Sequence, residues 1–391
     1  MAEARRVLIA SRLFAPEVSA GAFRLRALAQ GFLRLGCRVR VLTTTTPPSA
    51  PDLAVAEAGM TISRFPVLRD RGGNVRGYLQ YLSFDIPLFF RMLFAGYDLA
   101  VAEAPPTTGL VVSVISRLRR KPYAYYAADI WTDGVIAMGA PRIVITTMRA
   151  LEGHVMRHAA CVLSVSDEVS DRLETFGVDR ATIATVGNGV DTTMFSPDGP
   201  ARQSDVPYLV YTGTMSEWQG AERFVEAMPA VLERHPDAML RFFGQGVSEP
   251  VIREAAERLA PGHVLLGGVV APNEAAEWIR GAAASLVSIV PGIGYDFARP
   301  TKTYAAAACG TPVIFAGTGS GAALVRDNGL GRAVDYRAAD IAEAMIDAID
   351  SWKSGETDSL RAERAGWVEA NASLRAVGAK ASAAVMEASG A

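Results

Sequence analysis

Apolar positions along the chain fall into short runs that are separated by longer stretches of helical periodicity. Between the runs, stretches such as 23–35 place Leu25, Leu28 and Phe32 on one side of a helix. Strands that alternate with helices form a parallel sheet covered by helices on both faces. In the first half, the runs that predict strands are at 7–10, 39–43, 61–65, 99–102, 123–127 and 162–165.

The pattern restarts after a turn-rich segment at 187–207. We therefore expect an α/β protein with two doubly wound domains, at 1–198 and 199–372, joined by a linker near 199–206. Open parallel sheets bind ligands at the carboxyl ends of their strands, so the expected site lies in the cleft between the domains. The last stretch, 373–388, predicts a helix after an apolar turn at 365–368. The second set of predicted strands is at 208–213, 239–243, 264–266, 285–290 and 311–316.

Composition supports two domains and limits the class of protein. The chain has 391 residues, half of them apolar and a fifth charged, as in a globular enzyme. The net charge is −2, but residues 1–198 carry 22 basic and 18 acidic residues, and the remainder carries 17 and 23. A basic first half favours an anionic lipid or a phosphorylated acceptor, and a merely solvated surface is the alternative.

The three cysteines, Cys37, Cys161 and Cys309, are isolated, which argues against a disulfide framework and a structural zinc site. No apolar leader and no run of about 18 apolar residues is evident. We expect a cytoplasmic protein, with the inner face of the plasma membrane as a second location. The aromatic-rich stretch 78–94 predicts either a buried helix or a membrane-docking helix.

Three loop–helix junctions could carry chemistry. The first is a Gly/Ser/Pro loop before a helix that opens near Ala22, where Ser19, Ala20 and Gly21 could hold a phosphate or a polar acceptor. An ordinary βα turn is the alternative. In the second, Arg299 and Lys302 flank Thr301, the predicted N-cap of a helix that ends at Gly310. Two cations at a helix start suit a diphosphate, and surface charges beside a cap are the alternative.

The third junction, GTGSGA at 317–322, contains Gly319 and resembles a dinucleotide fingerprint. Such a fingerprint belongs to the first βαβ unit, and too few residues follow it here. We interpret it as a Gly-rich loop contacting a nucleotide diphosphate. His154 and His158 lie four apart on a predicted helix but lack a third ligand, so no metal site is predicted.

Taken in order, several blocks resemble glycosyltransferase family 4. They are FAPEVSAG at 14–21, DIWTDGVIAMG at 129–139, VLSVSDEVSDRL at 162–173, GNGVDTTMFSPD at 187–198, YTGTMSEWQG at 211–220 and PTKTYAAAACGTPVI at 300–314. The block at 129–139 is similar to a D-x-W-P stretch of one bacterial branch. The joint order of the blocks is specific, although each block alone is weak.

The resemblance implies a GT-B fold of two Rossmann-like domains, with the C-terminal helix 373–391 crossing back to the first. It implies a retaining transferase that takes a nucleotide-sugar donor, needs no cofactor or metal, and serves cell-envelope polysaccharide biosynthesis. Nucleic acid is not an expected partner. The acceptor would be a lipid-linked saccharide, a polysaccharide intermediate or a small molecule, with peripheral membrane association. The donor would contact Gly213, Thr214, Gln219, Gly244, Arg299, Thr301, Lys302 and Gly319.

The chain also departs from the family pattern. Thr214 and Gln219 stand where many members have Arg and Lys, Ala305 stands where many have a ribose-binding Glu, and Phe297 replaces the first acid of that pair. Asp129 follows the strand after which members carry a His, and we assign it as the catalytic or acceptor-orienting residue. The alternatives are an epimerase-like enzyme on the same fold and a catalytically silent partner protein.

Overall fold

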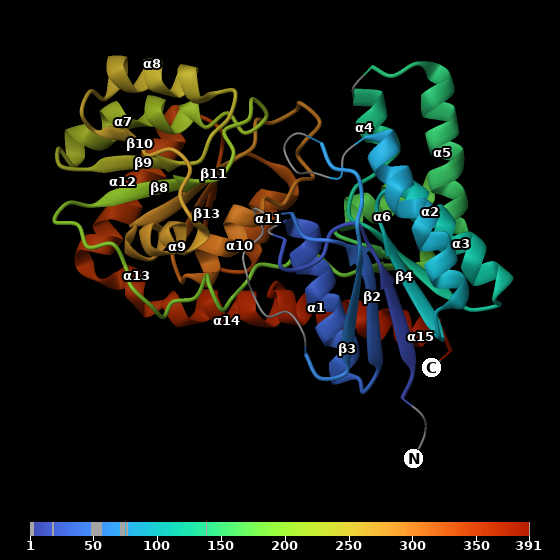
Figure 1. Cartoon of the computed structure of the whole chain (residues 1–391). Helices are drawn as coiled ribbons and strands as arrows, with labels where there is room; N and C mark the ends of the chain where they lie inside the picture. The colour runs from blue at the N-terminus through green and yellow to red at the C-terminus, as the bar shows by residue number, and fades with distance from the viewer. Residues whose placement is uncertain are drawn as a thin grey trace. The chain divides into compact units, whose positions relative to one another are not determined.

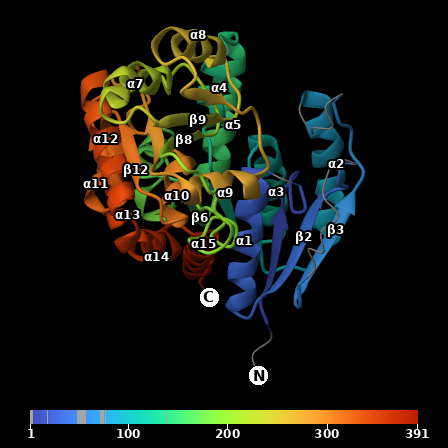
Figure 2. The same ribbon diagram turned by 90° about the vertical axis from the view of Figure 1, so that its left-hand side faces the viewer.

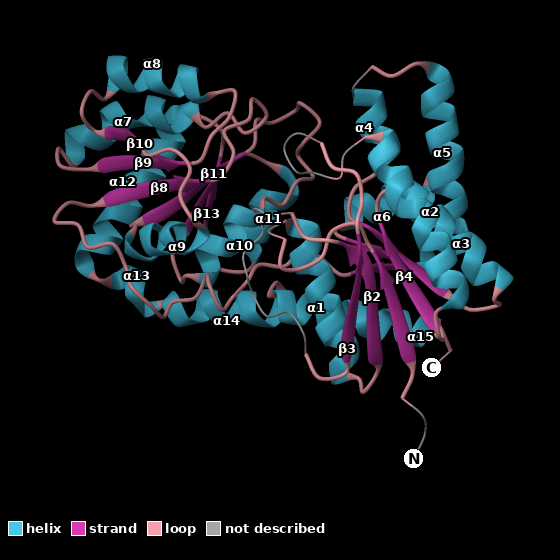
Figure 3. Cartoon of the chain, viewed as in Figure 1, coloured by secondary structure: helices cyan, strands magenta, loops and turns pink. Residues whose placement is uncertain are grey.

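The structure is a computed structural model that describes residues 4–17, 19–47, 57–70, 75, 77–137 and 139–390. The chain divides into two compact units. Unit 1 comprises Met1–Asn188 together with Leu374–Ala391, and unit 2 comprises Gly189–Ser373. Figure 3 shows that each unit has strands at its centre and helices around them.

Unit 1 is built on a seven-stranded sheet in the order β3-β2-β1-β4-β5-β6-β7, and every pair of neighbouring strands is parallel. Strands β4 and β5 are buried at every position, as expected for parallel strands covered on both faces. The strands are β1 (Arg6–Ala10), β2 (Arg38–Thr44), β3 (Met60–Phe65), β4 (Leu99–Glu103), β5 (Tyr123–Ala127), β6 (Cys161–Ser164) and β7 (Ile183–Thr185).

Helices cover both faces of this sheet (Figure 1). One face packs against α1 (Ala20–Arg34) and α15 (Leu374–Ala388) through residues such as Leu28 and Val385. The other face packs against α2 (Tyr78–Phe94), α3 (Pro106–Leu118), α5 (Arg142–Arg157) and α6 (Asp167–Glu174). A short helix, α4 (Trp131–Ala137), follows β5.

Unit 2 repeats the plan with a six-stranded parallel sheet in the order β10-β9-β8-β11-β12-β13. Counted within the unit this order is 3-2-1-4-5-6, which is the doubly wound order of dinucleotide-binding folds. The sheet comprises β8 (Tyr208–Thr212), β9 (Met239–Phe243), β10 (Val264–Leu266), β11 (Ala284–Ser288), β12 (Val313–Ala316) and β13 (Gly331–Val334).

Two helical layers enclose this second sheet. The first contains α7 (Glu222–Arg234), α8 (Glu249–Leu259) and α12 (Ala338–Ser354), which share one apolar core with the strands. The second contains α9 (Pro272–Gly281), α10 (Thr301–Ala308), α11 (Gly319–Asp327) and α14 (Arg361–Asn371). A four-residue helix, α13 (Glu356–Ser359), connects α12 to α14.

Eleven predicted strands are present at or within two residues of their predicted bounds, and the α/β doubly wound class is confirmed. The strands β7 and β13 were not predicted. Both lie at an edge of their sheet and are only partly buried, so they lack a continuous apolar run. The predicted apolar turn at 365–368 is wrong, because these residues lie inside α14, where Val368 is buried.

The division between the units also differs from the expected boundary at 198. Residues after Gly189 belong to unit 2 because its own side chains and backbone hold them. Val190 N donates to Ala372 O at 2.9 Å, and the Arg280 guanidinium donates to the carbonyls of Met194, Ser196 and Pro200 at 2.6–3.0 Å. The turn-rich segment is therefore a packed part of unit 2 as far as Pro200.

The stretch 78–94, predicted as either a buried or a membrane-docking helix, forms α2, which is buried on one side and exposed on the other. Helix α2 buries Phe84, Asp85, Leu88 and Met92 on one side only. None of the helices in the described ranges is long and apolar enough to cross a membrane. The three cysteines are buried and unpaired.

Candidate functional site

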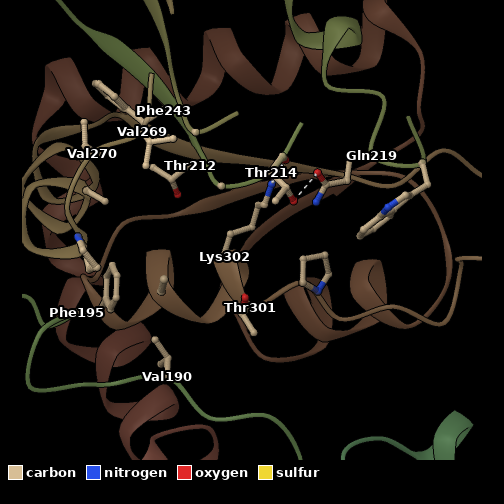
Figure 4. Close-up of a pocket in the computed structure, with 17 residues that line it drawn as sticks. Val190, Phe195, Thr212, Thr214, Gln219, Phe243, Val269, Val270, Thr301 and Lys302 are labelled. Carbon is tan, nitrogen blue, oxygen red and sulfur yellow. Dashed lines mark hydrogen bonds between the residues drawn. The ribbon is translucent and has the colours of Figure 1, made fainter. Parts of the chain in front are cut away.

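A cavity of about 560 Å³ lies in unit 2 at the carboxyl ends of its central strands (Figure 4). Strand order reverses between β8 and β11, and ligands of open α/β sheets bind at such a point. The loop after β8 supplies Gly213 and Thr214, and the start of α10 supplies Thr301 and Lys302. The geometry thus brings together two segments that are almost ninety residues apart in the chain.

Six of the eight predicted donor residues line this cavity: Gly213, Thr214, Gln219, Gly244, Thr301 and Lys302. Thr301 is the first residue of α10, and Pro300 occupies the N-cap position, so the predicted capping role of Thr301 is wrong. Proline suits this place because its missing N–H costs nothing at a helix start.

Lys302 is the one cation among the residues that line the cavity. Its Nζ lies 3.4 Å from the Thr214 carbonyl oxygen and 3.7 Å from the centre of the Tyr211 ring. No carboxylate in the described part of the chain pairs with it. Burial lowers the pKa of this ammonium group to about 7. The site therefore holds a partly desolvated cation without a counterion, which is the arrangement expected where an anionic ligand supplies the missing charge.

Gln219 organises the loop that follows β8. It is buried, and its Oε1 accepts hydrogen bonds from the Tyr211 hydroxyl at 2.9 Å, the Ser216 N–H at 3.3 Å and the Thr214 hydroxyl at 3.4 Å. Because the carbonyl oxygen is already used by its own loop, only the amide nitrogen of this side chain can serve a ligand. Gln219, which replaces a cation of the family pattern, thus mainly stabilises the loop after β8.

Two glycines allow the loops after β8 and β9 to approach each other. Gly213 and Gly244 have φ values of +117° and +137°. A Cβ atom on Gly244 would lie 1.8 Å from the Gly213 carbonyl oxygen, so no other residue fits there. This close approach forms the floor of the cavity beside Lys302.

The far end of the cavity is apolar. Figure 4 shows Phe195, Phe243, Val269 and Val270 on one side, and Thr214, Gln219 and Lys302 on the other. An apolar wall next to a cation is suited to a ligand with a flat, weakly polar group at one end and an anionic group at the other.

Two predicted donor residues, Arg299 and Gly319, do not line the cavity. Arg299 is half-buried, and its Nε is buried without a partner in the described residues. At Gly319 the loop before α10 already covers the start of α11. Ser320 N donates to the Asp296 carbonyl oxygen at 3.0 Å, and Thr318 Oγ1 donates to the Asp296 carboxylate at 2.7 Å.

This arrangement is unfavourable to the predicted diphosphate contact of the Gly-rich loop. The hydrogen bond from Thr318 lowers the pKa of Asp296, so a negatively charged carboxylate lies where the Gly-rich loop was predicted to contact the diphosphate. The carboxylate and the diphosphate would repel each other because both are negatively charged. The composition of the loop carried no sign of Asp296, because that residue lies more than twenty positions earlier.

Ala305 faces the cavity one helical turn beyond Lys302, in place of the acid that the family pattern places there. None of the residues that line the cavity is a carboxylate or a histidine. The described residues also contain no group of three or more His, Cys, Asp or Glu side chains that could hold a metal ion. The polar chemistry available in the cavity is therefore that of one cation, hydroxyl groups, the side chains of Gln219 and Trp218, and backbone amides.

A second pocket, of about 440 Å³, lies in unit 1 and is lined by Asp129. Its walls include Tyr78, Tyr81 and Trp131, and the last two rings meet edge to face with centroids 5.9 Å apart. The guanidinium of Arg12 lies 4.0 Å from the centre of the Tyr81 ring. Aromatic faces beside a carboxylate suit a polyol, which offers C–H groups to the rings and hydroxyl groups to the acid.

The predicted acceptor loop lies at the start of α1, at the strand-order reversal between β1 and β4. Ser19 is the N-cap, and its hydroxyl accepts from Ala22 N at 3.2 Å. Ala20 and Gly21 are the first residues of the helix. A Cβ atom on Gly21 would lie 3.1 Å from Glu103 Oε2, so a carboxylate stands next to this helix start. The loop is therefore better suited to a hydroxyl group than to a phosphate.

Glu103 was missed by the sequence reasoning. It ends strand β4, is buried, and accepts from Arg24 Nη2 at 2.5 Å and Nε at 3.1 Å. The available signal was an acid that closes the otherwise apolar strand LAVAE at its carboxyl end. That signal becomes specific only when the fold places the strand at the reversal point.

Two parallel doubly wound units, one of them with a ligand cavity at its reversal point, define the GT-B class of folds. Comparison with family models agrees with this class. A model described as a glycosyl transferase 4-like domain matches residues 20–189, and one described as glycosyl transferases group 1 matches residues 206–351. The chain belongs to glycosyltransferase family 4.

Individual relatives are distant. D-inositol 3-phosphate glycosyltransferase 2 of Catenulispora acidiphila is 26% identical over 228 residues, which are 53% of this chain and 52% of that protein. A GDP-mannose-dependent monoacylated alpha-(1-6)-phosphatidylinositol monomannoside mannosyltransferase of Corynebacterium glutamicum is 28% identical over 185 residues, 43% of this chain and 47% of that protein. The chain thus spans about half the length of the curated relatives it matches.

The solved structure of Anabaena HepE in complex with UDP and glucose is similar to this chain, with a TM-score of 0.62 and 16% sequence identity. The match covers 95% of this chain and 96% of the HepE chain. Similarity at this level of identity shows a shared fold alone.

Proposed function

We propose that this chain transfers a sugar from a nucleotide-sugar donor to an acceptor hydroxyl group, with retention of anomeric configuration. The observation that carries the proposal is Lys302, a partly desolvated cation at the reversal point of unit 2 that no carboxylate of the described residues pairs with. The ligand best matched to the cavity has a flat base at the apolar end and a diphosphate at Lys302. Membership of glycosyltransferase family 4 supports the same ligand class.

In this reaction the bond between the anomeric carbon and the diphosphate oxygen breaks, and a bond to the acceptor oxygen forms. The acceptor proton passes to the leaving phosphate oxygen, and a nucleoside diphosphate departs. Lys302 would stabilise the negative charge that grows on the diphosphate as the bond breaks, and this charge is larger in the transition state than in the ground state. Thr214 and Thr301 would hold the diphosphate in place through their hydroxyl groups.

For the acceptor we propose a saccharide or polyol on a lipid carrier, used at a membrane surface. The pocket of unit 1 offers Asp129 to hydroxyl groups and aromatic rings to the sugar face. The names of two relatives, which specify inositol 3-phosphate and a phosphatidylinositol monomannoside, support a polyol or glycolipid. Asp129 would orient the acceptor hydroxyl group.

The test is to incubate the protein with a panel of nucleotide sugars and a lipid extract, and to follow both nucleoside diphosphate release and glycolipid products. Release that depends on the extract, together with a new product whose anomeric configuration matches the donor, is expected. Isomerised donor without a product would indicate an epimerase instead. The lining of the cavity argues against an epimerase, because it contains no carboxylate or histidine that could transfer a proton at the sugar.

A nucleotide-binding partner that does not transfer sugar is the second candidate. Ala305 favours it, because it removes the acid that family members place at this point of the cavity. The two candidates differ in one measurement. A silent partner binds the nucleoside diphosphate but never releases it from a nucleotide sugar, and Ala305→Glu would then be expected to restore or improve donor binding.

We also propose that transfer needs no metal ion or other cofactor, with Lys302 taking the place that a divalent cation has in other transferases. Excess chelator is expected to leave the rate of transfer unchanged. Loss of transfer in chelator, followed by recovery with magnesium or manganese, would contradict the proposal.

A further inference from the structure

We infer that unit 1 carries a docking surface for anionic lipid bilayers, formed by one side of α2 and its neighbour α3. The reason for binding a membrane, access to a lipid-linked acceptor, rests on the proposed function. The surface itself lies in unit 1 and does not involve the cavity of unit 2. We call it the α2–α3 face, and it consists of Leu79, Leu82, Ile86, Phe90 and Phe94 of α2, Val114 and Leu118 of α3, and Leu68.

The first argument is the orientation of α2. A helix packed on a sheet normally turns its polar side to solvent. In α2, the exposed positions follow the helical repeat of three to four residues, and all of them are apolar or aromatic. The exposed fractions of Phe90 and Phe94 are 57% and 82%. The one acid of the helix, Asp85, is instead on the buried side.

The second argument is that neighbouring segments extend the same surface. Helices α2 and α3 pack on the same face of the sheet, so the side chains that both turn away from it share one surface. Arg119, which follows α3, donates to the carbonyl oxygen of Met92 at the end of α2, which fixes the two helix ends together. On the other flank Leu68 N donates to Ser83 Oγ at 3.0 Å, and Arg91 donates to Ser63 on β3. Figure 2 shows α2 and β3 on the same side of unit 1.

The α2–α3 face comprises eight exposed apolar side chains on two neighbouring helices and the segment between β3 and α2. Single exposed apolar residues are normal, whereas contiguous apolar patches on a folded protein mark a binding surface. Aromatic residues that alternate with Leu and Ile along a helix are typical of helices that lie in the interfacial region of a bilayer.

The third argument is charge, and it selects the kind of partner. Helices α2, α3 and α5 together contain only two acids, Asp85 and Glu152, and both are buried. The exposed Arg117 and Arg120 lie at the end of α3 without an ion pair in the described residues. Lys121 pairs with Asp98 at 3.4 Å, and that acid is already bound by Arg6.

Helices α2, α3 and α5 therefore present to solvent apolar side chains and cations that have no ion pair in the described residues, with no exposed acid of their own. The exposed acids of this helical layer, Asp167, Asp171 and Glu174, lie on α6. This combination fits an anionic bilayer, where the apolar side chains enter the interface and the cations meet phosphate groups. The pocket of unit 1 adjoins this face, because Tyr78 at the start of α2 lines that pocket.

The experiment is flotation of the full-length chain, without donor, on vesicles of phosphatidylcholine alone and of phosphatidylcholine with phosphatidylglycerol. Binding is expected to the second kind of vesicle and to be weakened by salt. The double variant Phe90→Asp/Phe94→Asp should lose at least about tenfold in partitioning, because each ring contributes on the order of the burial energy of an aromatic side chain. Both positions are exposed, so the fold should persist.

Val251→Asp is the matched control, since Val251 is similarly exposed, at 53%, on α8 of unit 2. It should bind vesicles as the wild-type chain does. Arg117→Glu/Arg120→Glu should reduce binding to the anionic vesicles specifically.

Three results would overturn the inference: no flotation of the wild-type chain, equal flotation of the Phe90/Phe94 variant, or a dimer in solution that this variant converts to a monomer. The last result would assign the face to a second copy of the chain. Nucleoside diphosphate binding measured on the same samples separates this failure from a failure of the proposed transferase activity, because Lys302 lies in the other unit.

Discussion

At the scale of single residues, the decisive feature is a lysine that forms no ion pair with any carboxylate in the described ranges of the chain. Lys302 contacts a carbonyl oxygen and an aromatic ring, and both are weak partners for an ammonium group. A charged group without a counterion in a cavity lowers the stability of the fold. Such groups are common at functional sites, because binding of an oppositely charged ligand compensates the charge.

Lys302→Ala is expected to weaken nucleoside diphosphate binding by about 1.5–3 kcal/mol, because one charge-assisted contact is lost. Calorimetric titration of the variant against the wild-type chain measures this difference. Arg299→Ala is the comparison, and it should cost less, since Arg299 does not line the cavity. Equal affinity of Lys302→Ala and wild type would remove Lys302 from the site.

The lowered pKa of Lys302 predicts that ligand binding takes up a proton. Above pH 7 the Lys302 side chain of the ligand-free protein is increasingly present as the neutral amine. A bound diphosphate favours the charged form and raises its pKa, so the affinity falls as pH rises above about 7. Below that pH the group is already charged and uptake disappears.

Titration at pH 8 in buffers of different ionisation enthalpy should show uptake approaching one proton. Lys302→Arg is the control for this measurement, because a guanidinium stays charged and should bind without uptake. Uptake that persists in this variant would point to another titrating group.

At the scale of elements, close helix packing in unit 1 depends on two glycines. A Cβ atom on Gly378 of α15 would lie 2.2 Å from the Ala27 carbonyl oxygen of α1, and one on Gly31 would lie 2.3 Å from the Gly378 carbonyl oxygen. The two backbones therefore touch directly. Alanine normally stabilises a helix relative to glycine, so the sign of a substitution here reports the contact.

Gly378→Ala is expected to reduce the free energy of unfolding by about 1–3 kcal/mol, because the helices must separate to admit a methyl group. Gly366→Ala in α14 is the matched control. Nothing lies within 4 Å of its added Cβ atom, so that change should increase stability by up to about 1 kcal/mol. Denaturant unfolding of both variants tests the contrast, and two changes of the same sign would contradict it.

At the scale of the whole molecule, the last helix belongs to the first unit although the second unit lies between them in the chain. Val377, Ala381 and Val385 of α15 are buried in the core of unit 1. The C-terminal segment is therefore a structural part of the N-terminal unit.

Deletion of residues 374–391 should lower the thermal transition of unit 1, because a covered face of its sheet becomes exposed. Nucleoside diphosphate should instead raise the transition of unit 2, where the cavity lies. Scanning calorimetry of the full-length and deleted chains, with and without the nucleotide, follows both transitions. A nucleotide-dependent shift of the unit 1 transition would contradict this assignment.

Most of the architecture could be predicted from the sequence because apolar runs of three to six residues, separated by helical periodicity, leave few alternatives to a parallel sheet. The same holds for Gly213, Thr301 and Lys302, which follow strands or open a helix in the pattern that doubly wound sheets require. Family-specific blocks added the glycosyltransferase class.

Only the tertiary structure decided which charges stay available and which apolar side chains face solvent. Asp296 occupies the start of α11 from a loop more than twenty residues away, and Glu103 meets Arg24 across 79 positions. Helix α2 has the composition of a core helix, yet it turns Phe90 and Phe94 outward. Composition sets how much apolar surface a segment carries, whereas packing against distant segments selects the side that is buried, and that choice is not encoded locally.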